Sequence, residues 1–324
     1  MPTDRTVSPV REISRRLLHL AMRRPATRAQ RLDASLLTLV HGTNDRVADL
    51  LAHDRWCLPT PDCEAGLELR ELIHGPEGPW GEAPVREVMD IAWIALGLAR
   101  DELRAFGSVL EQADPSSFAL DVLYRGMLES ASLVNWLLDM RLGARRRVAR
   151  GIVYRLSGAR HVESALKNFQ IGPIERQEEY GELTPQVVEF ADRLGFSDLD
   201  TDPRRLRCEG ETYPNYLDRS HALVRHYSST PHTPYQVYSG VLHAELWGLW
   251  RGYRQVAGEH PHERFEPIRH DLAIHTTTQG ALGAMIISAA RAASYLGATS
   301  ITESLDAWAA ILDVRIVELR PSQT

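Results

Sequence analysis

The segment DVLYRGMLESASLVNWLLDMR, residues 121–141, decides the fold class of this chain. Beginning at Leu120, one residue before this segment, apolar side chains recur at every third or fourth position. This is the spacing of one face of an α-helix. They are Leu120, Tyr124, Met127, Ala131, Val134 and Leu138. A helix that is apolar over most of its circumference lies inside a protein rather than on its surface. We therefore expect this segment to be the central helix of a bundle.

A second stripe of the same segment carries polar and aromatic side chains. It holds Arg125, Glu129, Ser132, Trp136 and Asp139 at alternating four- and three-residue steps. Arg125 and Glu129 are one helical turn apart and within reach of each other. A charge on a central helix must be paired or must face a wet cavity, because desolvating it alone is expensive. Two interpretations stay open: an intrahelical ion pair that supports packing, or one border of a ligand pocket.

Helical spacing of apolar residues continues through most of the chain, and strand-like alternation is almost absent. The pattern predicts an all-α multi-helix bundle of about nine or ten helices. We expect Gly297 to end one helix as a C-cap and Ser300 with Glu303 to begin the next as a capping box. The expected helices are 8–23, 26–54, 84–112, 116–145, 146–169, 173–194, 214–227, 233–256, 267–297 and 300–318.

Two stretches lack this helical spacing of apolar residues: the Pro/Gly-rich Trp56–Pro84 and the charged Phe196–Tyr213. Loops of this length are uncommon inside a compact domain and often serve as linkers or lids. We therefore divide the chain into a basic N-terminal helical hairpin (1–55), a Pro/Gly-rich connection (56–84) and a main α-helical bundle (85–324).

Composition narrows the classes of function. The net charge is −6 and the sequence pI is about 6.1, which gives no general attraction to nucleic acid or anionic membranes. Lys167 is the only lysine, an arginine bias typical of a GC-rich bacterial genome. Three cysteines, an odd and sparse number, indicate reduced thiols in a cytoplasmic protein rather than a disulfide framework.

Neither a secretory signal nor a membrane span is predicted. The N-terminus lacks the apolar core of a signal peptide, although it resembles an arginine-rich amphipathic presequence interrupted by Asp4 and Glu12. The most apolar stretch, 280–297, contains Arg291 and small polar residues. It is too short and too polar to span a bilayer, so we expect a buried helix.

A second segment with chemical potential is YQVYSGVLHAELWGLWRGYR, residues 235–254. His243, Trp247 and Trp250 fall on one helical stripe, and Tyr238 lies on a neighbouring one. A row of aromatic side chains that begins with a titratable histidine suits an aromatic, cationic or polyene ligand. Tryptophans at helical spacing are also ordinary core packing, so this alternative stays open.

A third segment, 269–291, places His275 and Gln279 on one face, and Gly280 and Gly283 allow another element to approach closely. Its plainer interpretation is a tightly packed helix of small residues. The run EHPHE at 259–263 lacks the fixed ligand spacing of a known metal site. No phosphate-binding, dinucleotide-binding, nucleophile-elbow or zinc-protease motif occurs. We therefore predict no metal site and no cofactor.

Arg125-x3-Glu129, followed by Asn135-Trp136, and Tyr238-Ser239-x3-His243 resemble uncharacterised bacterial helical proteins placed near the HEPN ribonucleases and abortive-infection proteins. The resemblance covers about residues 115–255 and implies an all-helical fold, an RNase or defence activity and a homodimer. HEPN nucleases carry an Arg-x4–6-His motif, and several pairs here fit that spacing. Among them are Arg219 with His226, Arg264 with His270, and Arg269 with His275. The best-matching region departs from the pattern, since Tyr238 stands where an arginine is required.

Our leading functional hypothesis is a small-molecule enzyme or ligand-binding protein with an apolar, Trp-lined pocket between segments 121–141 and 235–254. His243 and Glu129 would act as acid and base, and Arg125 would hold a carboxylate or phosphate. Further ligand contacts would come from Trp136, Asp139, Tyr238, Trp247, Trp250 and His275. A cyclase-like biosynthetic enzyme without the usual metal-binding acids is one version. The alternatives are a HEPN-like ribonuclease, for which nucleic acid would be the partner, and a non-catalytic helical interaction protein.

Overall fold

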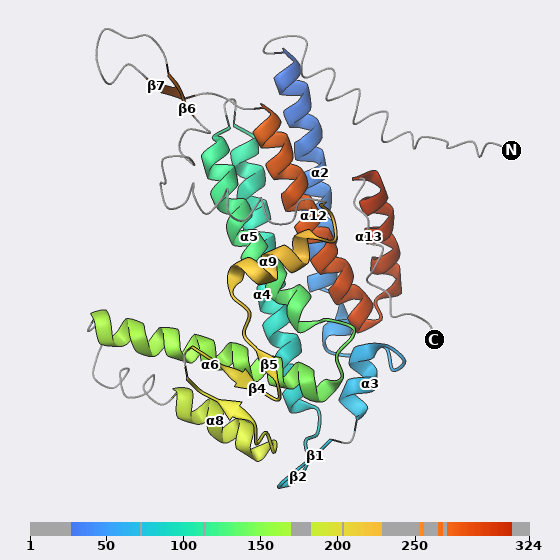
Figure 1. Ribbon diagram of the computed structural model, residues 1–324. Helices are drawn as coiled ribbons and strands as arrows, with labels where there is room; N and C mark the ends of the chain where they lie inside the picture. The colour runs from blue at the N-terminus through green and yellow to red at the C-terminus, as the bar shows by residue number, and fades with distance from the viewer. Residues whose placement is uncertain are drawn as a thin grey trace, which may run out of the picture.

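The computed structural model describes residues 27–71, 73–112, 115–169, 183–202, 204–228, 253–255, 265–267 and 271–312. These residues form nine α-helices with a few strands of two or three residues each, which confirms the all-α prediction (Figure 1). Long helices stand upright and side by side in the upper part of the molecule, and α6 (Ala144–Phe169) and α8 (Leu183–Arg193) lie across its lower end.

Helix α5 (Ser117–Leu137) is central, as its sequence predicted. It packs along α4 (Ala83–Leu110) on one side and along α12 (Asp271–Leu296) on the other. Every residue of its predicted apolar stripe is at most 1% exposed. Two buried hydrogen bonds join α5 to α12: Thr277 donates to Asp121 at 2.8 Å, and Ser288 donates to the Ala131 carbonyl at 2.9 Å.

Helix α12 packs closely because it carries glycines where bulky side chains cross it. A Cβ atom at Gly280 would lie 2.5 Å from the Tyr124 hydroxyl, and one at Gly283 would lie 2.7 Å from the Tyr227 ring. The two tyrosine hydroxyls are 2.9 Å apart. The predicted small-residue helix is thus confirmed, and the elements that approach it are tyrosine side chains. No described helix is long and apolar enough to cross a membrane.

Helix α2 (Thr27–Leu51) packs against α4 and α12, and α13 (Thr299–Ile311) packs against α12 and α2. Trp308 of α13 donates to Thr43 of α2 at 2.8 Å, and Arg46 lies over the Trp308 ring. The described part of the predicted N-terminal hairpin is therefore packed on the bundle. The division of the chain at residues 55 and 84 stays a prediction.

The Pro/Gly-rich connection is more structured than the sequence suggested. It contains the 3-10 turn Asp54–Trp56, helix α3 (Glu64–Arg70) and a hairpin of β1 (His74–Gly75) and β2 (Gly78–Pro79). Thr60 donates to the Gly297 carbonyl at 2.9 Å, and the Trp80 indole donates to the Leu194 carbonyl at 2.9 Å. These bonds attach the connection to the chain just after α12 and just after α8.

Arg147 anchors α6 to α3 and α12. Its guanidinium is fully buried, lies 2.8 Å from the Glu68 carboxylate and donates to the carbonyls of Leu137, Asp139 and Leu142. Tyr295 donates to the same Glu68 carboxylate at 2.6 Å. Burial of this charge is tolerated because its donors are shared among a carboxylate and three carbonyls.

The second interruption folds into a small antiparallel sheet, β3 (Leu199–Asp200), β4 (Arg207–Cys208) and β5 (Glu211–Thr212). The chain then forms α9 (Tyr216–Val224), which packs on α5. The predicted helix 173–194 is described from Leu183 onward, and 8–23 lies outside the described residues.

Three local predictions were wrong. The expected helix 116–145 ends at Leu137, because the Asp139 side chain accepts a hydrogen bond from the Arg141 amide and turns the chain. Residues 253–255 of the expected helix 233–256 form strand β6 (Tyr253–Gln255), since their backbone pairs with β7 (Phe265–Pro267). Gly297 ends α12 with a φ of 68°, as expected, but α13 begins at Thr299 without a side-chain cap, so the capping box does not form.

Candidate functional site

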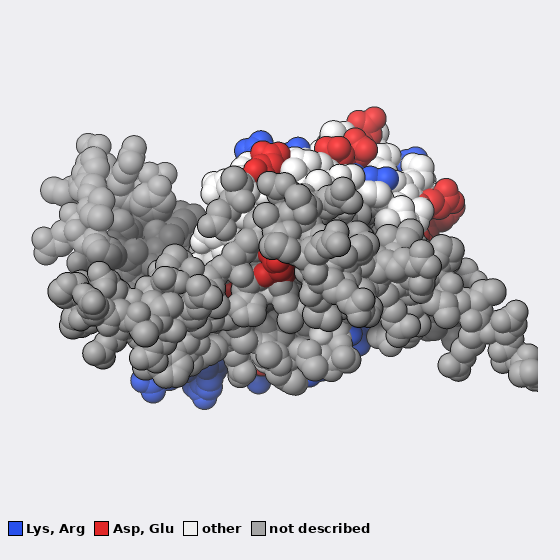
Figure 2. All heavy atoms as spheres, turned by 90° about the horizontal axis from the view of Figure 1, so that it is seen from above, with Lys and Arg blue, Asp and Glu red and all other residues white. Residues whose placement is uncertain are grey.

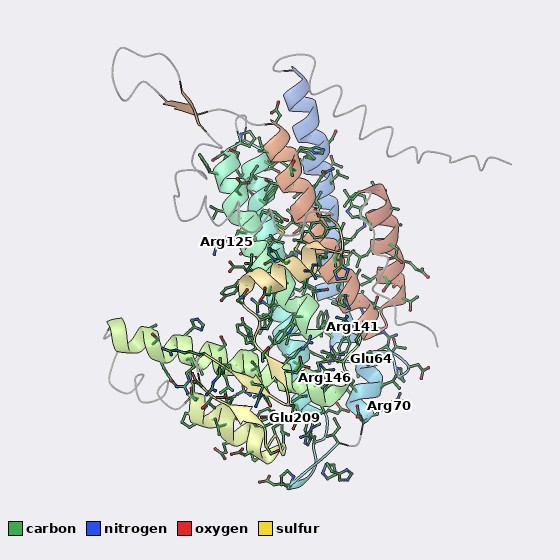
Figure 3. The ribbon with its side chains drawn as sticks, in the orientation of Figure 1. Glu64, Arg70, Arg125, Arg141, Arg146 and Glu209 are labelled. Carbon is green, nitrogen blue, oxygen red and sulfur yellow. The ribbon has the colours of Figure 1, made fainter. Side chains whose placement is uncertain are left out.

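The predicted pair of Arg125 and Glu129 forms on α5. Arg125 Nε lies 3.0 Å from Glu129 Oε1, and the two side chains are 13% and 27% exposed. Arg125 lies at the edge of the upright helices near α9, well apart from Arg146 and Glu209 at the lower end (Figure 3). The pair is therefore neither in the dry core nor on the open surface.

A second carboxyl group lies beside this pair. Glu102 of α4 faces α5 at Gly126, where an added Cβ would lie 3.0 Å from Glu102 Cδ. Burial, and next the negative charge of Glu129, raise the pKa of Glu102 to about 7, while a hydrogen bond with Ser130 lowers it slightly. Oε2 of Glu102 is buried without a hydrogen-bond partner in the described part of the chain. Glu102 thus takes up and releases its proton near neutral pH, unlike an ordinary glutamate.

Glu129 and Ser130 line a pocket of about 260 Å³. Four helices and the loop before α9 contribute its walls, so the site is built from parts of the chain more than 120 residues apart in sequence. Its apolar side comes from α4 and from Leu133 of α5, and its polar side from the other α5 residues, α6, α9 and the loop. The described lining residues are Ile91, Ile94, Ala95, Leu98, Glu129, Ser130, Leu133, Tyr154, Tyr213, Tyr216 and Arg219.

The polar side of the pocket is a cluster of three tyrosines around one arginine. Arg219 is only 3% exposed and donates to the Tyr213 hydroxyl at 2.7 Å. Its guanidinium lies 4.9 Å from the Tyr213 ring centroid and 5.0 Å from that of Tyr216. Burial raises the pKa of both Tyr154 and Tyr213, although the Arg219 charge acts in the opposite direction. The Tyr154 and Tyr213 phenols are therefore neutral hydrogen-bonding groups at physiological pH.

Trp136 and Asp139, both predicted to bind ligand, are held by arginines: Trp136 by Arg150 of α6, and Asp139 mainly by Arg141 in the turn before α6. Arg150 lies over the Trp136 ring and also pairs with Glu211 at 2.6 Å. Burial alone would raise the pKa of Asp139, but hydrogen bonds and charge from Arg141, with Arg150 beyond it, lower the pKa to about 2. Asp139 thus stays ionised and fixes the turn between α5 and α6. Trp136 packs edge-on against Tyr213, behind the pocket wall.

The remaining predicted site residues are not brought to this pocket by the described structure. His275 is half-buried on α12, and burial lowers the pKa of its imidazole. His243, Tyr238, Trp247 and Trp250 lie outside the described residues, as does the histidine-rich run at 259–263. Within the described ranges, no cluster of three or more His, Cys, Asp or Glu side chains could hold a metal ion.

Sequence reasoning missed Glu102 and the tyrosine cluster. A signal for Glu102 was present, since it continues the stripe Ile91, Ala95 and Leu98 at helical spacing, where an acid is out of place. The spacing of Tyr213, Tyr216 and Arg219 at three-residue steps was a weaker signal. Tyr154 comes from another helix, and no local pattern connects it to the others.

A second hollow, of about 520 Å³, lies beside the small sheet and is lined by Arg204, Arg205 and Arg207 among others. Two of these arginines are already neutralised: Arg205 pairs with Asp200 and Asp202, and Arg207 pairs with Asp198. On the face seen in Figure 2, the described surface likewise carries acidic and basic side chains close together. These parts of the surface therefore do not form a continuous basic track.

Comparison of the chain with protein-family models, curated protein sequences and solved structures finds no match. Among the Arg-x4–6-His pairs, Arg219 with His226 lies wholly within the described residues, and its arginine belongs to the pocket's tyrosine cluster.

Proposed function

We propose that this protein is an enzyme, or failing that a binding protein, for a small and largely apolar molecule, and that its site is the pocket lined by Glu129. The observation that carries the proposal is Glu129 on the pocket wall, with a second carboxyl group, Glu102, beside it whose pKa is raised to about 7. Neighbouring carboxyl groups in different surroundings are a common arrangement for acid–base catalysis.

The roles follow from position. Glu129 touches the pocket and is paired with Arg125, so it is the group that would accept a proton from a bound molecule. Glu102 does not line the pocket, but Ser130 does and is hydrogen-bonded to it. Glu102 therefore acts through Ser130, as a positioning residue beside the base.

The pocket wall supports a substrate that is mainly apolar. Ile94 and Leu98 are 54% and 55% exposed, so α4 presents open aliphatic surface at the pocket. Small-molecule sites are commonly mostly apolar with a few convergent polar groups. A volume of about 260 Å³ suits a compact ligand rather than a polymer. A cytoplasmic location belongs to the same proposal, since Cys57, Cys63 and Cys208 are all free thiols.

Binding is tested by screening small apolar compounds against the full-length protein with ligand-observed NMR. Ile94→Trp would fill the pocket at an exposed position, and Leu58→Trp, at a 69% exposed position outside the pocket, is the matched control. We expect the binding of these compounds to be abolished in Ile94→Trp and retained in Leu58→Trp. Binding that survives Ile94→Trp, or a screen without binders, would contradict the proposed site.

Catalysis is tested on the compounds that bind. Incubation in deuterated water followed by mass spectrometry detects proton exchange at carbon, and we expect Glu129→Gln to abolish it. Exchange that is equally fast with Glu129→Gln would remove Glu129 as the base, and the absence of exchange in every bound compound would leave a binding protein. RNA cleavage by the wild type that persists in Glu129→Gln would instead favour the ribonuclease alternative.

A further inference from the structure

Within the described part of the chain, Arg219 differs from the other buried arginines in lacking an acidic partner. Arg147 pairs with Glu68, and Arg291 pairs with Asp139. Within the described residues, no carboxylate lies within ion-pair distance of Arg219, and its Nε is buried without a hydrogen-bond partner. Its neighbours are the rings of Tyr213 and Tyr216 and one phenol hydroxyl.

Such an arrangement is expensive unless something compensates the charge. Burying a cation without an anion carries a large desolvation cost, and cation–π contacts with tyrosine offset only part of it. An anion that binds beside Arg219 would offset the rest. Because Arg219 lines the 260 Å³ pocket, the compensating anion can come from a bound ligand.

We infer that Arg219 forms an anion subsite in this pocket and that the ligand is a small organic acid bound through its carboxylate. Tyr213 occupies Nη1 of the guanidinium, which leaves the edge formed by Nε and Nη2. That edge presents two parallel N–H donors, the geometry that a planar carboxylate accepts in a bidentate manner.

Charge balance favours a carboxylate over a phosphate group. Among the described lining residues, Arg219 is the cation and Glu129 the anion, and Glu129 already has Arg125 as its partner. One unpaired positive charge matches a monoanion. A phosphate monoester near neutral pH carries a second negative charge, which the nearby Glu129 carboxylate would repel.

The aliphatic wall of the pocket accounts for the rest of the ligand. Ile94, Leu98 and Leu133 lie in the same pocket as Arg219, so an acid with a short apolar body would place its carboxylate on the arginine and its body on α4. This inference rests on the proposed function only in using the same pocket, because it requires no proton transfer by Glu129. It also moves the predicted carboxylate-binding role from Arg125, whose Nε is paired with Glu129, to Arg219.

The test compares 3-phenylpropionate with its uncharged amide, 3-phenylpropionamide, by isothermal titration calorimetry on the full-length protein at pH 7.5 and low salt. We expect the acid to bind at least tenfold more tightly than the amide. Equal affinities, or no binding of either compound, would overturn the carboxylate subsite. Phenyl phosphate is the third probe, and tighter binding of it than of the acid would overturn the choice of a carboxylate.

Variants connect the preference to Arg219. Arg219→Gln should lower the affinity for the acid at least tenfold and so remove its preference over the amide. Arg225→Gln is the matched control, because it removes an exposed arginine just beyond the end of the same helix. An unchanged acid affinity in Arg219→Gln would contradict the inference. Arg219→Lys, which keeps the charge but loses the planar fork, should bind the acid more weakly than the wild type and serves if the glutamine variant does not fold.

The outcomes separate this inference from the proposed function. Amide binding that Ile94→Trp blocks, without a preference for the acid, would refute the subsite and leave the pocket intact. A preference for the acid that Arg219→Gln removes, without proton exchange in deuterated water, would confirm the subsite and refute the catalytic role of Glu129.

Discussion

Glu102 of α4 and Glu129 of α5 form a pair of carboxyl groups in which the charge of Glu129 helps to raise the pKa of Glu102 to about 7. Glycine at position 126 permits this proximity, since a larger residue there would collide with the Glu102 carboxyl group. The two helices meet here with an acid on each side and Arg125 beside only one of them. Glu129 is thus paired with a cation, while Glu102 lies in a buried position that favours its protonated form.

This pair predicts a specific dependence of stability on pH. The folded-state pKa of Glu102 is raised above its value of 4.5 in the unfolded chain, so the unfolded chain loses this proton first as pH rises. The contribution of Glu102 to the free energy of unfolding should therefore fall between about pH 4.5 and 7 and level off above that range. Allowing for solvent screening, this contribution falls by an amount on the order of 1–2 kcal/mol.

Glu102→Gln should remove this contribution. Urea unfolding at several pH values checks it: the variant should gain stability relative to the wild type as pH rises from 4.5 to 7. The two proteins are compared at each pH, which cancels the contributions of all other groups. Stability profiles that run parallel across this range would show that Glu102 titrates as an ordinary glutamate.

Glu68 should be among the most sensitive positions for stability. Its carboxylate accepts hydrogen bonds from Arg147 and Tyr295, and removing it would leave a fully buried guanidinium without its acid. We expect Glu68→Ala to cost about 3–5 kcal/mol. Glu82→Ala, which breaks the exposed pair with Arg86, is the control and should cost about 1 kcal/mol or less. Chemical denaturation that gives similar costs for both variants would refute the structural role of Arg147.

The close contact of Tyr124 with α12 predicts that Gly280 tolerates no side chain. Gly280→Ala would force its Cβ against the Tyr124 ring and hydroxyl, and we expect a loss of about 1–3 kcal/mol from overpacking. Gly158→Ala on α6 is the matched control, because no atom lies within 4 Å of its added Cβ. That variant should gain about 0.5–1 kcal/mol from the greater helix propensity of alanine. Thermal melting of the pair measures both effects, and a stabilised Gly280→Ala would contradict this packing.

The wall predicted from His243, Trp247 and Trp250 can be tested in solution. If it binds ligand, Trp247→Ala should weaken the binding of compounds found in the NMR screen by more than its loss of stability explains. His243→Ala should leave folding unchanged and reduce affinity or turnover. Tryptophan fluorescence titrations measure the binding, and melting curves measure the stability. If both substitutions merely unfold the protein, the stripe is core packing.

The sequence was most informative where one helix face decides the outcome. The stripe from Leu120 to Leu138 predicted a central helix, and all six of its residues are buried. The i, i+4 spacing predicted the contact of Arg125 with Glu129. It did not predict the end of α5 at Leu137, because the polar turn made by Asp139 interrupts an apolar spacing that would otherwise continue into α6.

The chain by itself thus determined the helical fold class, the identity of the central helix and one ion pair, since each depends on residues within a few turns of one helix. Only the tertiary structure decided which groups share a pocket. Glu102, Tyr154 and Arg219 come from three helices, and their proximity depends on how α4, α6 and α9 pack around α5. The chemistry of this site lies in burial and in charges from distant segments, which raise one pKa and leave one arginine without an acid. Local spacing carries no information about either effect.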